Sequence, residues 1–211
     1  MNTLLHLDSS INGARSHSRR VTATFAQEWN RSHPEGHYLY RDLATDPPPL
    51  LDSVTNRAAN TPEDSHSTEE AAAWRVAKPI VEELIAADII LIGAPMYNFT
   101  IPSSLKAWLD QIAIQRFMAD DTGTSPLSDK TFVIATSRGG AYGPGTPREK
   151  FDHQEPYLRS VLGLLGVGEH LTFLHTEMAL SLEVPDLAKF KDIFEASSQA
   201  AQQKARTLAS A

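Results

Sequence analysis

The chain has 211 residues, a length that suits one domain with a full hydrophobic core. Its composition, 41% apolar and 21% charged, is that of a water-soluble globular protein. The net charge of −7 argues against nucleic acid as a partner, because phosphate binding needs a clustered basic surface. Cysteine is absent, which excludes disulfides, thiol nucleophiles and cysteine-ligated metals. Redox chemistry would therefore require a bound cofactor.

Targeting signals are also missing from the sequence. The N-terminus lacks the basic flank and the apolar run of a signal peptide, and no apolar stretch reaches the roughly 18 residues that span a bilayer. No cluster of lysine and arginine indicates an anionic membrane surface. We therefore expect a cytoplasmic protein with no membrane partner.

The first elements alternate between strand and helix. The apolar run at residues 4–7, with its turn-rich exit, predicts a strand. Val21, Phe25 and Trp29 then repeat at i, i+4 and i+8, which predicts a helix, and Ser18 is its expected N-cap.

The middle of the chain continues this alternation. A second strand is predicted at residues 37–41, and residues 52–68 are expected to be a polar loop. Pro79 should kink or restart the next helix. The apolar stripe of that helix is Trp74, Ala77, Val81, Leu84 and Ile85. Residues 88–95 predict a strand that is covered on both faces, because they are apolar without alternation.

The second half repeats the pattern. Pro102 is expected to open a helix, and residues 118–129 to form a polar loop. Strands are predicted at 131–136 and 171–174, with a glycine- and proline-rich loop at 139–147. The apolar face of the helix after Pro102 is Leu105, Trp108, Leu109 and Ile112. A further helix carries Tyr157, Leu158, Val161, Leu162 and Leu165 and ends at Gly166, and a last one starts at Pro185 with Leu187, Phe190 and Phe194 facing inward.

Five strands alternating with five helices predict an α/β fold with a parallel sheet and helices on both faces. No internal repeat or linker divides the chain, so residues 1–211 are expected to form a single domain. In the strand order 2-1-3-4-5, the first, third and fourth strands are neighbours. The loops at 9–18, 95–99 and 137–145 would then line one crevice at the carboxyl ends of the strands.

These loops suit different parts of a flavin nucleotide. Serines ahead of a helix N-terminus, with Arg15 at the rim, can bind a phosphomonoester. Residues 95–99 offer a thioether, two rings and an amide to an aromatic cofactor, and Gly139 and Gly140 allow a close backbone approach. Taken singly, the serines could be helix caps, the rings core packing and the glycines a turn. Their convergence on one crevice favours the flavin hypothesis.

Other site patterns do not occur in the sequence. No G-x-G-x-x-G follows the first strand, no phosphate-binding P-loop is present, and Ser137 does not lie in a G-x-S-x-G elbow. His33 and His37 are separated by Pro34 and Gly36, which argues against a shared helical face. No metal site is predicted, and we expect no catalytic acid or base side chain.

Several segments together resemble the FMN-dependent NADH-azoreductases, also described as FMN-dependent NADH:quinone oxidoreductases. The segments are Leu7-Asp8-Ser9-Ser10, Ser16-His17-Ser18, Ala94-Pro95-Met96-Tyr97-Asn98-Phe99, Thr136-Ser137-Arg138-Gly139-Gly140, residues 101–110 and residues 156–166. The resemblance implies a flavodoxin-like three-layer sandwich with sheet order 2-1-3-4-5, and a cytoplasmic homodimer. It also implies two-step transfer from NADH or NADPH through FMN to a quinone or azo acceptor.

Carried over by position, the resemblance assigns the residues of an FMN site. The phosphate residues are Ser10, Ser16, His17 and Ser18, and the ring residues are Pro95, Met96, Tyr97, Asn98, Phe99, Ser137, Arg138, Gly139 and Gly140. His17 stands where glutamine is common in the family. Residues 115–120 replace a glycine-containing Thr-Phe-x-Tyr stretch, so that Phe117 is the expected substrate-pocket residue.

Two other functions fit the same fold class. One is a flavodoxin-type FMN electron carrier without pyridine nucleotide turnover, because fold alone does not fix function. The other is a flavin-free hydrolase or regulatory module.

Overall fold

A computed structural model describes residues 2–211 and contains one five-stranded parallel sheet. The strands are β1 (Thr3–Asp8), β2 (His37–Asp42), β3 (Ile89–Pro95), β4 (Thr131–Ser137) and β5 (Leu171–Thr176). Their order is β2-β1-β3-β4-β5 and every neighbouring pair is parallel. The predicted fold class and strand order are therefore confirmed.

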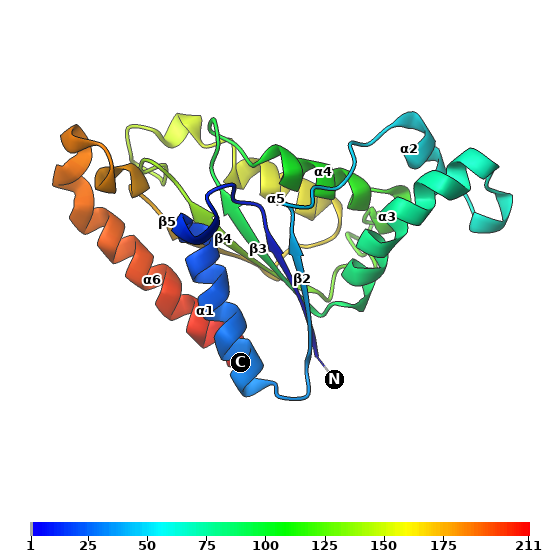
Figure 1. Cartoon of the computed structure of the whole chain (residues 1–211), viewed down its shortest axis with the longest axis horizontal. Coiled ribbons are helices and arrows are strands. Elements are labelled where there is room, and N and C mark those ends of the chain that lie inside the picture. Colours follow the sequence, from blue (N-terminus) through cyan, green and yellow to red (C-terminus); the bar gives the residue numbers. More distant parts are fainter. Residues whose placement is uncertain (1) are drawn as a thin grey trace.

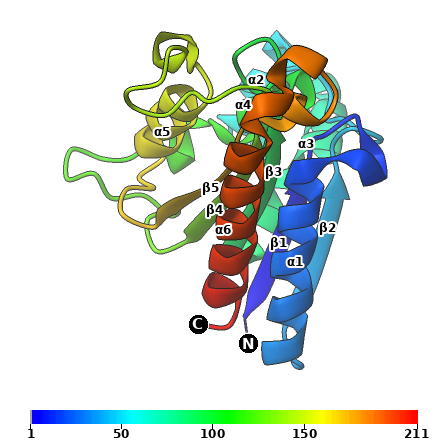
Figure 2. The same cartoon turned by 90° about the vertical axis from the view of Figure 1, so that its left-hand side faces the viewer.

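Helices cover both faces of this sheet (Figures 1 and 2). The helices are α1 (His17–Ser32), α2 (Ser53–Ala59), α3 (Thr68–Ala86), α4 (Ser103–Ile112), α5 (Glu155–Leu164) and α6 (Lys191–Ala209). Side chains of α1 and α6 form one apolar core with the sheet, and side chains of α3, α4 and α5 form the other. The result is three layers.

The burial of the strands follows from this layering. All six residues of β1 and nearly all of β3 and β4 are buried, because helices lie on both sides of them. Edge strand β2 is largely exposed. Central strands of a doubly covered sheet read as continuous apolar runs, which is why residues 88–95 were predictable.

Four local predictions are wrong. Residues 52–68 contain α2, capped by the Asp52 side chain, and a short 3-10 turn instead of a loop. Ile85, on the supposed inner stripe of α3, is 52% exposed; of the two alternatives predicted for Pro79, a kink or a restart, the restart does not occur, since Pro79 lies inside α3. Pro185 begins a 3-10 segment, η6 (Pro185–Phe190), and α6 itself starts only at Lys191. The N-cap of α1 is Ser16 rather than Ser18.

Candidate functional site

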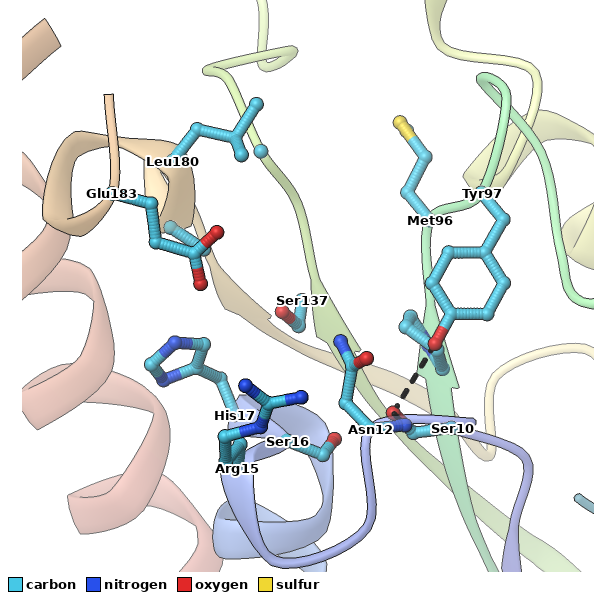
Figure 3. Close-up of a pocket in the computed structure, with 13 residues that line it drawn as sticks. Ser10, Asn12, Arg15, Ser16, His17, Met96, Tyr97, Ser137, Leu180 and Glu183 are labelled. Atoms are coloured by element: carbon cyan, nitrogen blue, oxygen red, sulfur yellow. Dashed lines mark hydrogen bonds between the residues drawn. The ribbon is translucent and has the colours of Figure 1, made fainter.

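A cavity of about 360 Å³ lies at the carboxyl ends of β1, β3 and β4 (Figure 3). The loops after these three strands supply most of its walls, as the strand order predicts. The predicted residues that line it are Ser10, Ser16, His17, Pro95, Met96, Tyr97, Ser137 and Gly139. A volume of this size lies within the range of small-molecule sites in proteins.

The loop between β1 and α1 forms the floor of the cavity. Ser9 anchors its start, since the Ser9 hydroxyl donates to the Gly93 carbonyl at 2.7 Å. Ser16 ends it as the N-cap of α1, and its hydroxyl accepts a hydrogen bond from the Arg19 N–H at 3.2 Å. A serine is favoured here because its side chain satisfies one of the N–H groups that the first helical turn leaves without a partner.

The start of α1 is suited to an anion. The N–H groups of His17 and Ser18 belong to the first turn, so they have no carbonyl one turn earlier in the helix. Ser18 is buried and its hydroxyl lies 3.1 Å from that of Ser16. Because free N–H groups and the helix dipole both favour negative charge, this end of the cavity fits a phosphate group.

Two charged side chains point into the cavity from opposite sides, Arg15 from below and Glu183 from above (Figure 3). Arg15 makes no ion pair with any carboxylate within residues 2–211, so its charge is available to an anion. His17 packs edge-to-face on Phe194. Burial lowers the pKa of His17, and Arg20 lowers it further while Glu183 opposes the change. The lowered pKa favours the neutral form of the His17 ring.

The loop after β3 reverses the chain in a tight turn. Tyr97 and Thr100 exchange backbone hydrogen bonds of 2.9 and 3.1 Å, and Asn98 and Phe99 between them both have positive φ, 48° and 71°. That is the pattern of a type I′ turn, in which glycine or asparagine is usual and a phenylalanine is strained. Such strain persists where the surrounding structure enforces it, which is common at functional sites.

The first and second loops are joined by one side chain. The Tyr97 hydroxyl lies 3.3 Å from the Ser10 hydroxyl and accepts a hydrogen bond from the Ile11 N–H at 3.1 Å. Figure 3 shows the Tyr97 ring along one wall of the cavity, with Met96 beside it. The wall therefore offers an aromatic ring and a thioether, and it is held against the floor.

The loop after β4 departs from its expected roles. Arg138 is only 1% exposed and points away from the cavity, where it pairs with Asp152, Glu155 and Glu177 at 3.2 to 3.6 Å. The reason for glycine at 139 also differs. A Cβ there would lie 2.7 Å from Leu180 Cδ1, so glycine makes room for Leu180 at a position that also lines the cavity.

Several predicted residues do not line this cavity. They are Ser18, Asn98, Phe99, Arg138, Gly140 and Phe117. Ser18 supports the floor from behind, and Asn98 lines a neighbouring hollow beyond the 97–100 turn. Phe117 is 2% exposed and belongs to the apolar core with α3 and α4. In this chain it is a core residue, and the guanidinium of the exposed Arg116 lies over its ring, 5.3 Å from the ring centroid.

The sequence reading missed four lining residues, Asn12, Ala179, Leu180 and Glu183. Three of them come from or follow the 3-10 turn η5 (Ala179–Leu182), which is bonded to the β4 loop through the Leu180 N–H and the Gly139 carbonyl at 3.2 Å. No sequence pattern marks this segment. Its only signal is its position after β5, at the same edge of the sheet.

Metal and membrane features can be assessed for the described part of the chain. Within residues 2–211, no group of three or more histidines, cysteines, aspartates or glutamates is arranged to hold a metal ion. None of the helices in that range is both long and apolar enough to cross a membrane.

The fold and the site together define a flavodoxin-like protein, and residues 2–205 match the family described as having a flavodoxin-like fold. The chain is 42% identical to the FMN-dependent NADH:quinone oxidoreductase of Frankia casuarinae, over 98% of each chain. It is also 42% identical to a protein of that name from Streptomyces coelicolor, over 99% of this chain and 94% of the other. It belongs to the family of FMN-dependent NADH:quinone oxidoreductases.

Solved structures agree on the fold. An azoreductase from Bacillus anthracis superposes with a TM-score of 0.83 at 21% identity, covering 100% of this chain and 99% of the other. An FMN-dependent NADH-azoreductase from the same species, solved in complex with FMN, gives a TM-score of 0.79 at 20% identity over 99% of this chain and all of the other.

Proposed function

We propose that this protein is an FMN-dependent NAD(P)H oxidoreductase that reduces quinones and azo compounds in a two-electron, ping-pong reaction. The observation that carries the proposal is the convergence of three strand-to-helix loops on one cavity, with an anion-binding helix start at one end and an aromatic wall at the other. The family membership of nearly the whole chain supports the same function. A flavodoxin-type electron carrier shares the fold but not these relatives.

The residues fit the phosphate end of FMN. The helix N–H groups at His17 and Ser18, the hydroxyls of Ser10 and Ser16 and the Arg15 guanidinium would together hold the phosphate. Neutral His17 would donate one hydrogen bond rather than a charge. Since Arg15 is the cation that faces the cavity, it would supply most of the electrostatic attraction.

The ring end is built from the other two loops. Pro95, Met96 and Tyr97 would cover the isoalloxazine. Asn98, which lines the hollow next to the cavity, would bring its amide to the ring edge from that side. Ser137, Arg138, Gly139 and Gly140 would flank the opposite edge, Ser137 and Gly139 directly and Arg138 by holding the loop from behind.

Bound FMN supplies the electron-transfer chemistry, and the chain supplies position and electrostatics. No side chain has to act as acid or base for an acceptor that stacks on the ring. Glu183 gives the cavity a negative group close enough to act on His17, so Arg15 and the helix N–H groups would have to outweigh its repulsion of the phosphate. Leu180 and Met96 give the upper part of the cavity an apolar lining that limits the access of water.

We also propose that the protein is a cytoplasmic homodimer that uses NADH or NADPH, that a single domain spans residues 1–211 and that neither nucleic acid nor membrane is a partner. Exposed apolar side chains next to the cavity support a dimer. Ile11 is 75% exposed and Phe99 is 44% exposed, and both lie on loops that a second subunit could cover. A flavin placed near the subunit boundary would then be shielded by both chains.

Steady-state kinetics test the proposed reaction. Initial rates of NADH oxidation should be measured at several concentrations of NADH and of a naphthoquinone, with FMN-loaded protein. The proposal predicts parallel lines in double-reciprocal plots, because NAD⁺ leaves before the quinone binds. The electron carrier would be indicated instead if the protein retained FMN but oxidised NADH no faster than free FMN does.

A further inference from the structure

Arg19, in the first turns of α1, contacts both ends of the loop that forms the cavity floor. Its guanidinium donates two hydrogen bonds to the Ser10 carbonyl, from Nε at 3.2 Å and from Nη2 at 2.8 Å. Its backbone N–H donates to the Ser16 hydroxyl at 3.2 Å. The loop begins at Ser10 and ends at Ser16, so one residue fixes both of its ends.

The loop has little packing of its own. Ile11, Asn12 and the short 3-10 turn η1 (Gly13–Arg15) contribute no buried side chain. A loop without buried side chains loses its shape unless hydrogen bonds hold it, because ordering each residue costs conformational entropy. The contacts of Arg19, together with those of the Tyr97 hydroxyl to Ser10 and Ile11, therefore hold this loop in shape.

The charge of Arg19 is neutralised within the protein. Asp42 Oδ1 lies 2.6 Å from Nη2, and the buried Asp8 carboxylate lies 3.6 Å from Nη1. The hydrogen bond with Asp42 raises the pKa of Arg19, so the guanidinium stays charged. Two carboxylates surround it, and it lines a hollow on the far side of the loop instead of the proposed FMN cavity.

The position of Asp8 is itself fixed. The Thr22 hydroxyl donates to Asp8 Oδ1 at 3.0 Å, and the Tyr40 hydroxyl lies 3.3 Å from Oδ2. Gly93 on β3 leaves the space that this carboxylate occupies, since a Cβ there would lie 2.3 Å from Asp8 Oδ1. Asp8 is thus a rigid, buried support for the Arg19 guanidinium.

We propose that Arg19 is a positioning residue for the cofactor phosphate, which it affects through the shape of the Ser10–Ser16 loop and not through its charge. Arg15, which faces the cavity without an ion-pair partner among the described residues, has the opposite role and attracts the phosphate by charge. This inference rests on the proposed FMN function. Arg19 keeps the loop ordered, and Arg15 attracts the phosphate electrostatically.

The test compares affinities for FMN and for riboflavin, which lacks the phosphate, by quenching of flavin fluorescence over a series of salt concentrations. Arg19→Lys keeps the positive charge but cannot donate the same pair of hydrogen bonds to the Ser10 carbonyl. We expect the Kd for FMN to rise about tenfold and that for riboflavin to change less than twofold. The salt dependence of FMN binding should stay that of the wild type.

Two further variants calibrate this result. Arg15→Gln should also weaken FMN binding, but with a shallower dependence on salt because an attracting charge has been removed. Arg20→Lys is the matched control, since Arg20 is the adjacent, exposed arginine of the same helix and should bind both flavins as the wild type does. If Arg19→Lys does not fold, Asp42→Asn replaces it. That variant loosens the grip of Arg19, so FMN binding should weaken two- to threefold with riboflavin binding unchanged.

Three results would overturn the inference. They are unchanged FMN affinity in Arg19→Lys, equal losses for FMN and riboflavin, and a salt dependence that falls as in Arg15→Gln. All three require a wild type that binds FMN. A wild type that binds neither flavin would instead overturn the proposed function, so the two failures are distinguishable.

Discussion

The loops after β1 and after β4 both reach the proposed FMN cavity, but a half-buried arginine holds the one and a buried arginine holds the other. Arg19 grips the carbonyl of the first loop and is balanced by two carboxylates. Arg138 lies within the loop after β4, and three carboxylates balance its charge. Its side chain is 1% exposed, against 15% for the side chain of Arg19. The first arrangement shapes a ligand-facing loop, whereas the second ties β4 to the start of α5 and the end of β5.

Arg19 and Arg138 show that a cation next to this cavity need not point into it. Sequence position placed Arg138 among the ring residues, and its side chain instead points into an acidic cluster. A buried charge left without its partner costs more than an exposed one. Substitution of Arg138 should therefore mainly lower stability, whereas substitution of Arg19 should mainly weaken cofactor binding.

The largest expected effect is the loss of stability in Arg138→Met. Removing the guanidinium leaves three carboxylates around a buried apolar side chain, which should lower the free energy of unfolding by about 3–5 kcal/mol. Urea unfolding of the FMN-free protein measures it. Arg19→Met is the comparison and should lose less stability but more FMN affinity. The account would be contradicted if Arg19→Met lost more stability than Arg138→Met and Arg138→Met lost more FMN affinity than Arg19→Met.

Gly139→Ala should have the next largest effect, on FMN affinity. The added Cβ would meet Leu180 Cδ1 at 2.7 Å and Cγ at 3.0 Å, so the η5 wall of the cavity must shift. Overpacking of this size costs roughly 1 kcal/mol or more, about a fivefold rise in Kd.

A second substitution checks the cause. The double variant Gly139→Ala/Leu180→Ala removes the clash and should recover most of the lost affinity. Affinity that stays low in the double variant would mean that Gly139 is needed for direct approach to the ring, as the sequence had indicated.

The pH dependence of stability tests the carboxylates around Arg138, of which Glu155 is one. A hydrogen bond from His175, followed by one from Arg159, outweighs burial and lowers the pKa of Glu155 from 4.5 to about 2. A carboxylate with a depressed pKa stabilises the fold above its unfolded pKa and loses that contribution as pH falls. Stability should therefore decline between about pH 4.5 and 2.

Glu155→Gln isolates this titration. The variant should be less stable than the wild type at neutral pH, and the difference between the two should shrink across that acid range. Unfolding free energies from denaturant titrations at a series of pH values measure it. A difference that is independent of pH would show that Glu155 contributes by packing and not by its charge.

The smallest expected effect is that of Asn98→Ala, which should weaken FMN retention about two- to threefold through the loss of one neutral hydrogen bond to the ring edge. Alanine is also disfavoured at the positive φ of this position. Asn98→Gly keeps the turn and removes only the amide, so it separates the two causes. An unchanged FMN affinity in both variants would remove Asn98 from the site.

Much of this architecture could be predicted from the sequence, because most of its strands and helices have a local apolar pattern. The apolar run at 88–95 and the stripe Val21, Phe25 and Trp29 report burial directly. The polar helix α2 could not be predicted in this way, since its seven residues have no long apolar stripe and depend on an Asp52 cap. Ser18 and Ser16 are equally good caps by composition, and only geometry distinguishes them.

The site was predictable where it follows from strand order and not where it depends on side-chain direction. The convergence of Ser10, Tyr97 and Ser137 on one cavity is set by the sheet, and it is confirmed as geometry. The inward course of Phe117 and the outward turn of Arg138 are set by tertiary packing. Glu183 belongs to a segment whose contact with the β4 loop has no local signal in the sequence.

The most direct test of the flavin account is anaerobic stopped-flow absorbance of FMN-loaded protein, mixed first with NADH and then with a quinone. The account predicts fast loss of the yellow flavin absorbance with NADH and its full return with the quinone. Protein that binds FMN but stays yellow with both NADH and NADPH would contradict it, and failure to bind FMN at all would contradict the site itself.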